Sequence, residues 1–408
     1  MSAHPRGADA AGDRGRLELA DIVRAHGAAF CAQRSLSGVQ YRALRAIGAC
    51  RTAALGGHIA QCDACGAQRY AYHSCRNRHC PKCQTLVKER WLAARRAELL
   101  PVPYFHLVFT LPHELNALAQ GNPVQIYGIL FAAVSATLVE FGANPRWLGG
   151  EIAATLVLHT WGQNLNQHLH LHCLVAAGAL HRDGHWIRAR RGFLFPVQAL
   201  SKVFRGKLLS ALEHAFASHQ LKFAGATGAL ANAGAIQPFV AALRAHDWVV
   251  YAKQPFSGPQ QVLDYLGRYT HRVALSNNRL TYFDEREVRF RYKDYAHGNR
   301  RKVLSLSPAE FIRRCLLHVL PRGFMRIRHY GLLANRNKRL KLAQARSALD
   351  QPPLAQAPPP PPESVEAFWL RIANFDIHQC TQCHAGRMVL IAALLSQSAR
   401  GPPPQRSA

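Results

Sequence analysis

Residues 168–172 read His-Leu-His-Leu-His, and this alternation is the strongest single constraint on what the chain can fold into. In a β-strand, successive side chains point to opposite faces, so the three histidines would share one face and the two leucines the other. With 22 histidines in 408 residues, chance alone would give about 0.06 such triplets. The pattern therefore predicts a strand that packs its leucines into a core and presents imidazoles to a divalent metal, in preference to an ordinary polar strand face.

His159 precedes this strand in the segment LVLHTWGQNLNQ, which is typical of a strand followed by a loop. If the two strands pair antiparallel, His159 comes to lie beside His170 and His172, and the three nitrogens form one site. Three protein ligands leave positions for water and a phosphate oxygen, as metal-assisted catalysis requires. Gln163 and His168 are alternative third ligands.

The charge balance of the chain points to a polyanionic partner. There are 51 Lys and Arg against 23 Asp and Glu, a net charge of +28, which is unusual for an enzyme of small metabolites and favours DNA. The longest apolar run, Tyr127–Val139, is too short and mixed to span a bilayer, and the N-terminus lacks an apolar signal core. We therefore expect no membrane partner and a cytoplasmic, nucleoid-associated protein.

Eleven cysteines occur in the chain, and three Cys-x-x-Cys pairs stand where chance predicts about 0.3. In a cytosolic protein such pairs indicate metal sites rather than disulfides. Fourteen residues separate the first two pairs, which is close to a zinc-ribbon spacing. The predicted ligands of one structural Zn²⁺ are Cys62, Cys65, Cys80 and Cys83.

Other residues near these pairs leave the zinc ligand set open. Cys75, His73 and His79 are further candidates within the same basic module. The third pair, Cys380 and Cys383, is half a zinc site without an obvious partner in the sequence.

Periodicity along the chain predicts an α+β protein: helices before residue 51, a zinc ribbon, then an antiparallel sheet flanked by helices. Tyr104–Leu111 is expected to be the first, mostly buried strand of that sheet. The expected divisions are a disordered segment 1–15, an N-terminal helical and zinc-ribbon domain 16–95, a catalytic domain 96–346, a proline-rich linker 347–366, and a short cysteine-containing segment with a disordered tail 367–408.

Tyr265 and Tyr269 lie four residues apart in the segment PQQVLDYLGRYTHRV. On a helix this spacing places both hydroxyls on one face, one turn apart. Taken alone, the spacing more often reflects core packing. Arg268 and Arg272 beside the tyrosines supply positive charge suited to a phosphate.

Two further segments predict contacts with DNA phosphates. VRFRY is expected to be a strand with one basic face, formed by Arg289 and Arg291. Residues 321–346 carry eight Lys and Arg and no acidic residue, which favours phosphate contact over a merely solvated face. Arg326 and Arg328 are the candidates in this segment.

Six motifs follow one another along the chain: CRT..LGGH, SCRNRHCPKCQ, LHTWGQ, the His-x-His pair, YLGRYTHRVALSN and LPRGFMRIRHYG. In this order they closely resemble the two-tyrosine HUH transposases of rolling-circle bacterial insertion sequences, over roughly residues 18–345. The resemblance implies an HUH-type antiparallel sheet, a metal-bound pair at His170 and His172, and nucleophilic tyrosines at Tyr265 and Tyr269. It places the zinc module on the four cysteines named above and does not settle the third ligand of the catalytic metal.

The function implied is rolling-circle transposition. With Mg²⁺ or Mn²⁺ bound, a tyrosine would attack single-stranded or hairpin DNA at element ends and target, giving a 5′-phosphotyrosine and a free 3′-OH without a nucleotide cofactor. Two alternatives come from other classes: a zinc-ribbon DNA-binding regulator that never cuts, and a metal-dependent hydrolase that uses water and leaves no covalent adduct.

Overall fold

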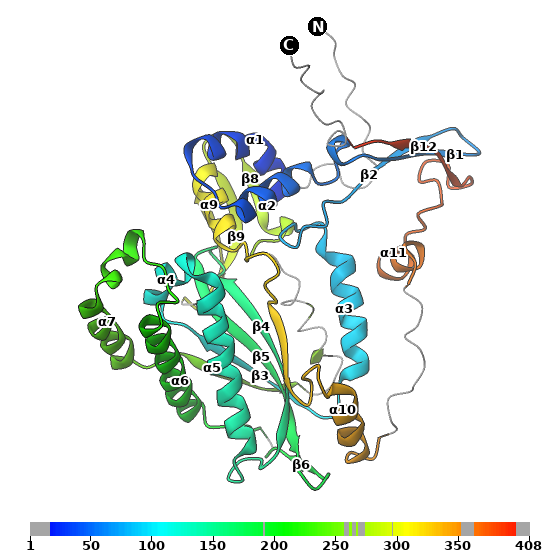
Figure 1. Cartoon of the computed structure of the whole chain (residues 1–408). Coiled ribbons are helices and arrows are strands. Elements are labelled where there is room, and N and C mark those ends of the chain that lie inside the picture. Colours follow the sequence, from blue (N-terminus) through cyan, green and yellow to red (C-terminus); the bar gives the residue numbers. More distant parts are fainter. Residues whose placement is uncertain are drawn as a thin grey trace, which may run out of the picture. The chain divides into compact units, whose positions relative to one another are not determined.

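The computed structural model describes residues 17–396, apart from 191, 257–260, 263–266, 268–273, 296 and 352–362 (Figure 1). The chain divides into two compact units, each built from segments far apart in the sequence. Unit 1 comprises residues 1–87, 275–316 and 356–408, and unit 2 comprises residues 88–274 and 317–355. Residues 275–316 and 356–408 thus group with the N-terminal part of the chain.

Unit 1 contains two three-stranded antiparallel sheets, ordered β12-β1-β2 and β10-β9-β8. The strands are β1 (Gly57–Cys62), β2 (Gln68–Tyr72), β8 (Leu280–Phe283), β9 (Val288–Asp294), β10 (Arg300–Leu306) and β12 (Met388–Leu394). The helices are α1 (Leu19–Gln33), α2 (Gly38–Ala49), α9 (Pro308–Leu317) and α11 (Val365–Ala373), with 3-10 turns η1 (Ala53–Leu55) and η4 (Asn277–Arg279).

Strand β9 has the two faces that its alternation predicts. Val288 and Phe290 are fully buried, and Phe290 packs against Phe311 of α9 with ring centroids 5.9 Å apart. Arg289 and Arg291 alternate with them and are exposed. Burial of the apolar residues thus fixes the register that turns the arginines toward solvent.

Unit 2 is organised around a six-stranded sheet in the order β11-β4-β5-β3-β7, with β6 paired to β5, and its pairings are all antiparallel. Its strands are β3 (Tyr104–Thr110), β4 (Glu151–Trp161), β5 (Gln167–Leu180), β6 (Trp186–Arg188), β7 (Val250–Phe256) and β11 (Ile327–Gly331). Its helices are α3 (Gln84–Glu98, which begins just before the boundary), α4 (Asn116–Gly121), α5 (Pro123–Ala143), α6 (Val197–Ala217), α7 (Ala233–Ala245) and α10 (Lys338–Ser347), with η2 (His113–Leu115) and η3 (Gly225–Ala231). The predicted α+β class with an antiparallel sheet is confirmed.

The two faces of this sheet are covered differently. One face carries Leu169, Leu171 and Cys173 of β5, all fully buried in the main core with residues of α5 and α6, and Figure 1 shows these two helices over the sheet. On the opposite face, Leu174 packs in a second core with Leu92 of α3 and other residues of α3 and α10. Near the start of β5, before Leu174, this second face bears histidines in place of aliphatic side chains. One face of the sheet is therefore apolar, and the other face is apolar in one part and polar in another.

Helix α5 is long and apolar enough to cross a membrane, and the bent pair η3 and α7 passes the same test only when counted together. Most of α5 is nevertheless buried inside the protein, where Leu130, Phe131 and Val134 are fully enclosed in the main core. A mostly buried apolar helix is what the interior of a folded domain requires.

Candidate metal sites

The predicted histidine strand forms within β5, and its pairing with β4 places a further histidine on the same face. His159 lies directly opposite His170, and Val157 lies opposite His172. Opposed residues of an antiparallel pair share a face, so His159, His170 and His172 project together. The register between β4 and β5 shifts between His159 and Trp161, at the end of the hairpin.

The three imidazoles converge. One ligand nitrogen from each of His159, His170 and His172 lies within 4.8 Å of the others. The Nε2 atoms of His170 and His172 are 3.1 Å apart, close to the separation of two nitrogens that each lie about 2 Å from one ion. His159 is 3% exposed and stacks on Trp161 with ring centroids 4.4 Å apart. We call these three residues the histidine cluster.

Hydrogen bonds fix which nitrogens face the centre of the histidine cluster. His170 Nδ1 lies 2.9 Å from the carbonyl oxygen of His168. A carbonyl can only accept, so Nδ1 carries the proton and the Nε2 of neutral His170 keeps a free lone pair. His172 Nδ1 lies 2.9 Å from Nε2 of His106 on β3. The outer nitrogens are thus occupied, and both Nε2 atoms are directed inward.

Burial keeps these rings neutral. Loss of solvation lowers the pKa of His106 and of His170 to about 3, and lowers that of His172 well below its ordinary value. Repulsion from neighbouring histidines and from Lys253 adds to the effect on His172. A neutral imidazole is the form that binds a metal, so His170 and His172 can coordinate an ion at neutral pH.

The predicted site residues are only partly placed by the structure. Of the candidates for the third ligand, His159 joins the histidine cluster, whereas the exposed His168 does not belong to it. Gln163 lies in the turn after β4 and stays an alternative ligand. Tyr265, Tyr269, Arg268 and Arg272 lie outside the described residues.

His106 was missed at the sequence level. The segment YFHLVFT is typical of an apolar core strand, and a histidine in the middle of that strand was the available signal. In the structure His106 is 3% exposed.

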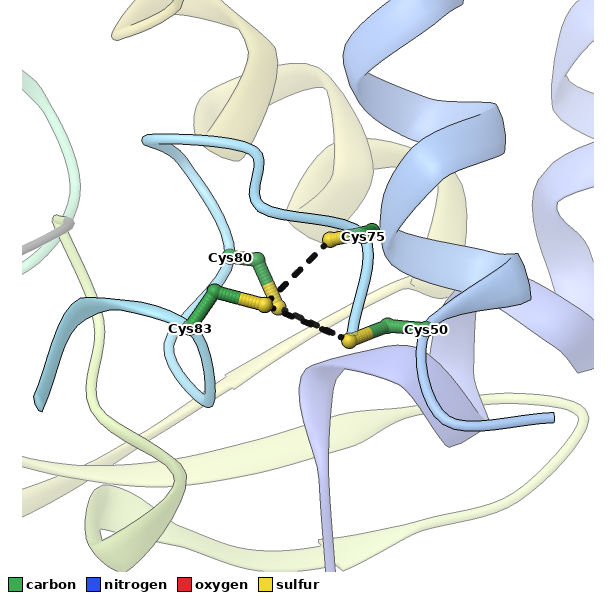
Figure 2. Close-up of side chains that lie close together, drawn as sticks. All are labelled: Cys50, Cys75, Cys80 and Cys83. Atoms are coloured by element: carbon green, nitrogen blue, oxygen red, sulfur yellow. Dashed lines mark hydrogen bonds between the residues drawn. The ribbon is translucent and has the colours of Figure 1, made fainter. Parts of the chain in front are cut away.

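Four cysteines of unit 1, including the second Cys-x-x-Cys pair, lie close together (Figure 2). We call Cys50, Cys75, Cys80 and Cys83 the Cys50 cluster. Its sulfur atoms lie 3.5 Å apart for Cys50–Cys83 and Cys75–Cys83, and 3.6 Å apart for Cys80–Cys50. Sulfurs bound to one zinc ion at about 2.3 Å in a tetrahedron lie roughly 3.8 Å from each other, so the donor set fits Zn²⁺. Cys50 caps the end of α2, and Cys83 directly precedes α3.

The first Cys-x-x-Cys pair belongs to a separate group of cysteines. Cys62, Cys65, Cys380 and Cys383 form what we call the Cys62 cluster, with sulfur separations of 3.6 Å for Cys62–Cys383 and 3.7 Å for Cys65–Cys380. The expectation that the first two Cys-x-x-Cys pairs bind one ion together is therefore corrected. Pairing of β1 with β12 brings the third Cys-x-x-Cys pair to the first, and Cys50 and Cys75 complete the second.

The proposed phosphate-binding arginines differ in their surroundings. Arg289 forms an ion pair with Glu287, which raises the pKa of the guanidinium. Arg291 is exposed on the same strand face. Arg328 is half-buried, with its guanidinium carbon 4.2 Å from the centroid of the Phe131 ring. Arg326 is half-buried as well.

Comparison with known proteins identifies the family. One family model, described as "Putative transposase", matches residues 153–341, and another, described as "Transposase zinc-binding domain", matches residues 22–111. The chain is 50% identical over 388 residues to the "Putative transposase y4qJ" of Sinorhizobium fredii (strain NBRC 101917 / NGR234), an alignment covering 95% of this chain and 97% of that protein. The chain belongs to the IS91/IS801 family of Y2 transposases.

A second relative of the transposase is the "Transposase for insertion sequence element IS801" of Pseudomonas savastanoi pv. phaseolicola, 28% identical over 356 residues, 86% of this chain and 83% of that protein. No solved structure matches the transposase. The histidine cluster lies within the first matched region, and the Cys50 cluster lies within the zinc-binding region. The enzyme class is thereby established, and the zinc-binding region contains four cysteines, the Cys50 cluster, of the composition that zinc requires.

Proposed function

We propose that the transposase moves its element by the rolling-circle route, with Tyr265 and Tyr269 as nucleophiles and the histidine cluster as the seat of a catalytic divalent metal. The observation that carries the proposal is the convergence of His159, His170 and His172 on one sheet face, with Nε2 atoms 3.1 Å apart in the His170–His172 pair. At this separation the two Nε2 atoms are close enough to bind one ion at about 2 Å each.

The donor set also bears on which metal is used. Nitrogen ligands bind Mn²⁺ more readily than Mg²⁺, which prefers carboxylate and phosphate oxygens. Three imidazoles therefore favour Mn²⁺ of the two ions expected. His106 is proposed as a positioning residue, because it accepts the Nδ1 proton of His172 when His172 Nε2 is a ligand.

In the proposed reaction, His159, His170 and His172 would hold the divalent ion, which would supply positive charge for the scissile phosphate and the departing oxygen. The tyrosine hydroxyl loses its proton and its oxygen bonds to phosphorus, while the bond from phosphorus to the 3′ oxygen breaks and that oxygen gains a proton. The products are a 5′-phosphotyrosine and a free 3′-OH. One phosphodiester replaces another, so strand transfer to the target needs no ATP or other nucleotide.

The DNA is proposed to be single-stranded or hairpin element ends and target, within the bacterial nucleoid. The exposed sheet face that bears Arg291 also carries an aromatic ring. Tyr282 is 42% exposed, and the guanidinium carbon of Arg289 lies 5.1 Å from the centroid of the Tyr282 ring. Cations combined with exposed aromatic rings suit unpaired bases and backbone. Arg268, Arg272, Arg326 and Arg328 are proposed to contact phosphates as well.

The test is to incubate the full chain with labelled single strands from the ends of its own element and Mn²⁺. A protein–DNA adduct that survives denaturation is expected. His170→Ala/His172→Ala should form none while retaining most of its DNA binding, because the metal site and not the basic surface is removed. Cleavage without an adduct would favour the hydrolase, and binding without cleavage would favour the regulator.

A further inference from the structure

We propose that the Cys62 cluster is a second structural zinc site, distinct from the Cys50 cluster, and that it joins the C-terminal segment 363–396 to the N-terminal ribbon. The matched zinc-binding region ends at residue 111 and so includes only half of this cluster. Cys62 and Cys383 are 321 residues apart in the chain, yet their sulfurs lie 3.6 Å from each other. The site goes beyond the proposed transposition chemistry and does not depend on it.

The backbone around the Cys62 cluster has the turns of two zinc knuckles. Gly66 N–H donates to the Cys62 carbonyl at 3.1 Å, and Gly66 has a φ of 72°, which a residue with a side chain rarely adopts. In the other knuckle, His384 N–H donates to the Cys380 carbonyl at 3.1 Å. Two pairs of thiols on tight turns are the usual framework of a four-cysteine zinc site.

Amide groups also point at the sulfur atoms of the C-terminal pair. Gln382 N–H lies 3.4 Å from Cys380 Sγ, and Gly386 N–H lies 3.3 Å from Cys383 Sγ. Hydrogen bonds of this kind stabilise a thiolate, the form of cysteine that binds metal. Gly386 also packs so closely on Cys62 that an added Cβ would clash with its sulfur. The segment is thus shaped to bring four ligands together.

Among the residues that the structure describes, the hydrophobic core of the sheet β12-β1-β2 is very small. The buried residues that hold it together are Ala60, Cys62, Cys380 and Met388, and half of these are thiols of the cluster. Figure 1 shows β12 alongside β1, and the pairing runs from Gly57 opposite Leu394 to Cys62 opposite Met388. A small sheet with so little apolar burial needs a metal or a comparable crosslink for stability. A metal that links two distant segments also lowers the conformational entropy of the unfolded chain, and this stabilising effect is larger for a long loop.

Zinc content provides the first test. In a His170→Ala/His172→Ala background, which removes the histidine cluster, the full chain should contain two Zn²⁺ by elemental mass spectrometry. Adding Cys380→Ser/Cys383→Ser should reduce the content to one, whereas the matched control Cys31→Ser/Cys315→Ser should keep two. These control cysteines lie outside both clusters. Retention of both ions in the Cys380→Ser/Cys383→Ser protein would overturn the proposal.

A second experiment leaves every cysteine intact, so its result does not depend on whether a cysteine variant folds. A protease site is inserted within residues 352–362 of the full chain, and the cleaved protein is passed over a sizing column. We expect the fragment 363–408 to remain bound in zinc-containing buffer and to separate after treatment with a strong zinc chelator. Separation in both buffers, or retention in both, would contradict a zinc-dependent junction.

Discussion

Replacing His106 tests whether the histidine cluster is built to hold a metal. In His106→Leu the hydrogen bond of 2.9 Å to His172 Nδ1 is lost, and a buried N–H is left without its acceptor when Nε2 binds an ion. Leaving such a group unsatisfied costs about 1–3 kcal/mol, and each 1.4 kcal/mol is a factor of ten in affinity. We expect the dissociation constant for Mn²⁺ to rise about 10-fold to 100-fold, the usual effect of removing an outer partner of a metal-bound histidine.

His106→Gln is the matched variant, because its amide oxygen can accept the same proton. It should keep Mn²⁺ affinity within about three-fold of the unmodified enzyme. Mn²⁺ binding is followed by electron paramagnetic resonance of the free ion, with zinc retained by the soft cysteine ligands. Equal affinity of the leucine and unmodified proteins would refute the proposed role of His106, and so would failure of glutamine to restore binding.

Three further outcomes are expected. Leu171→Ala, in the fully buried face of β5, should lower the free energy of unfolding by about 3 kcal/mol in urea titrations. Burial lowers the pKa of His318 to about 4, so its stabilising effect is present above pH 6.5 and lost as the pH falls toward 4. Between pH 6.5 and pH 4, the melting temperature of His318→Gln should therefore fall less than that of the unmodified protein. Arg291→Gln should reduce the salt dependence of single-stranded DNA binding by about 0.7 in log–log slope, measured by fluorescence anisotropy, and the ion-paired Arg289→Gln should reduce it less.

Local periodicity predicted the parts of the fold that depend on one segment. Alternation in His-Leu-His-Leu-His was sufficient to orient β5, because the leucines must enter the core and the histidines then face the other way. The same reasoning oriented β9. The position of His159 beside His170 depends on the register between β4 and β5, which is set by contacts between two separate segments.

The cysteine ligand sets could not be predicted from spacing. Two Cys-x-x-Cys pairs at zinc-ribbon distance look like one site, but which knuckles share an ion depends on the non-local pairing of β1 with β12. Cys50 gave no signal because it stands outside any such pair. His106 was hidden for a different reason: an apolar strand pattern describes burial and does not reveal that one buried residue faces a polar cluster.

The central claim is that two tyrosines make the covalent bond to DNA, and the most direct measurement is the adduct yield of Tyr265→Phe/Tyr269→Phe. Phenylalanine keeps the ring and removes the nucleophile, so folding and DNA binding should be retained. With labelled single-stranded element ends and Mn²⁺, denaturing gels should show no adduct from this protein and a reduced, nonzero yield from either single variant. Cleavage or adduct formation by the folded, DNA-binding double variant at the unmodified rate would contradict the account.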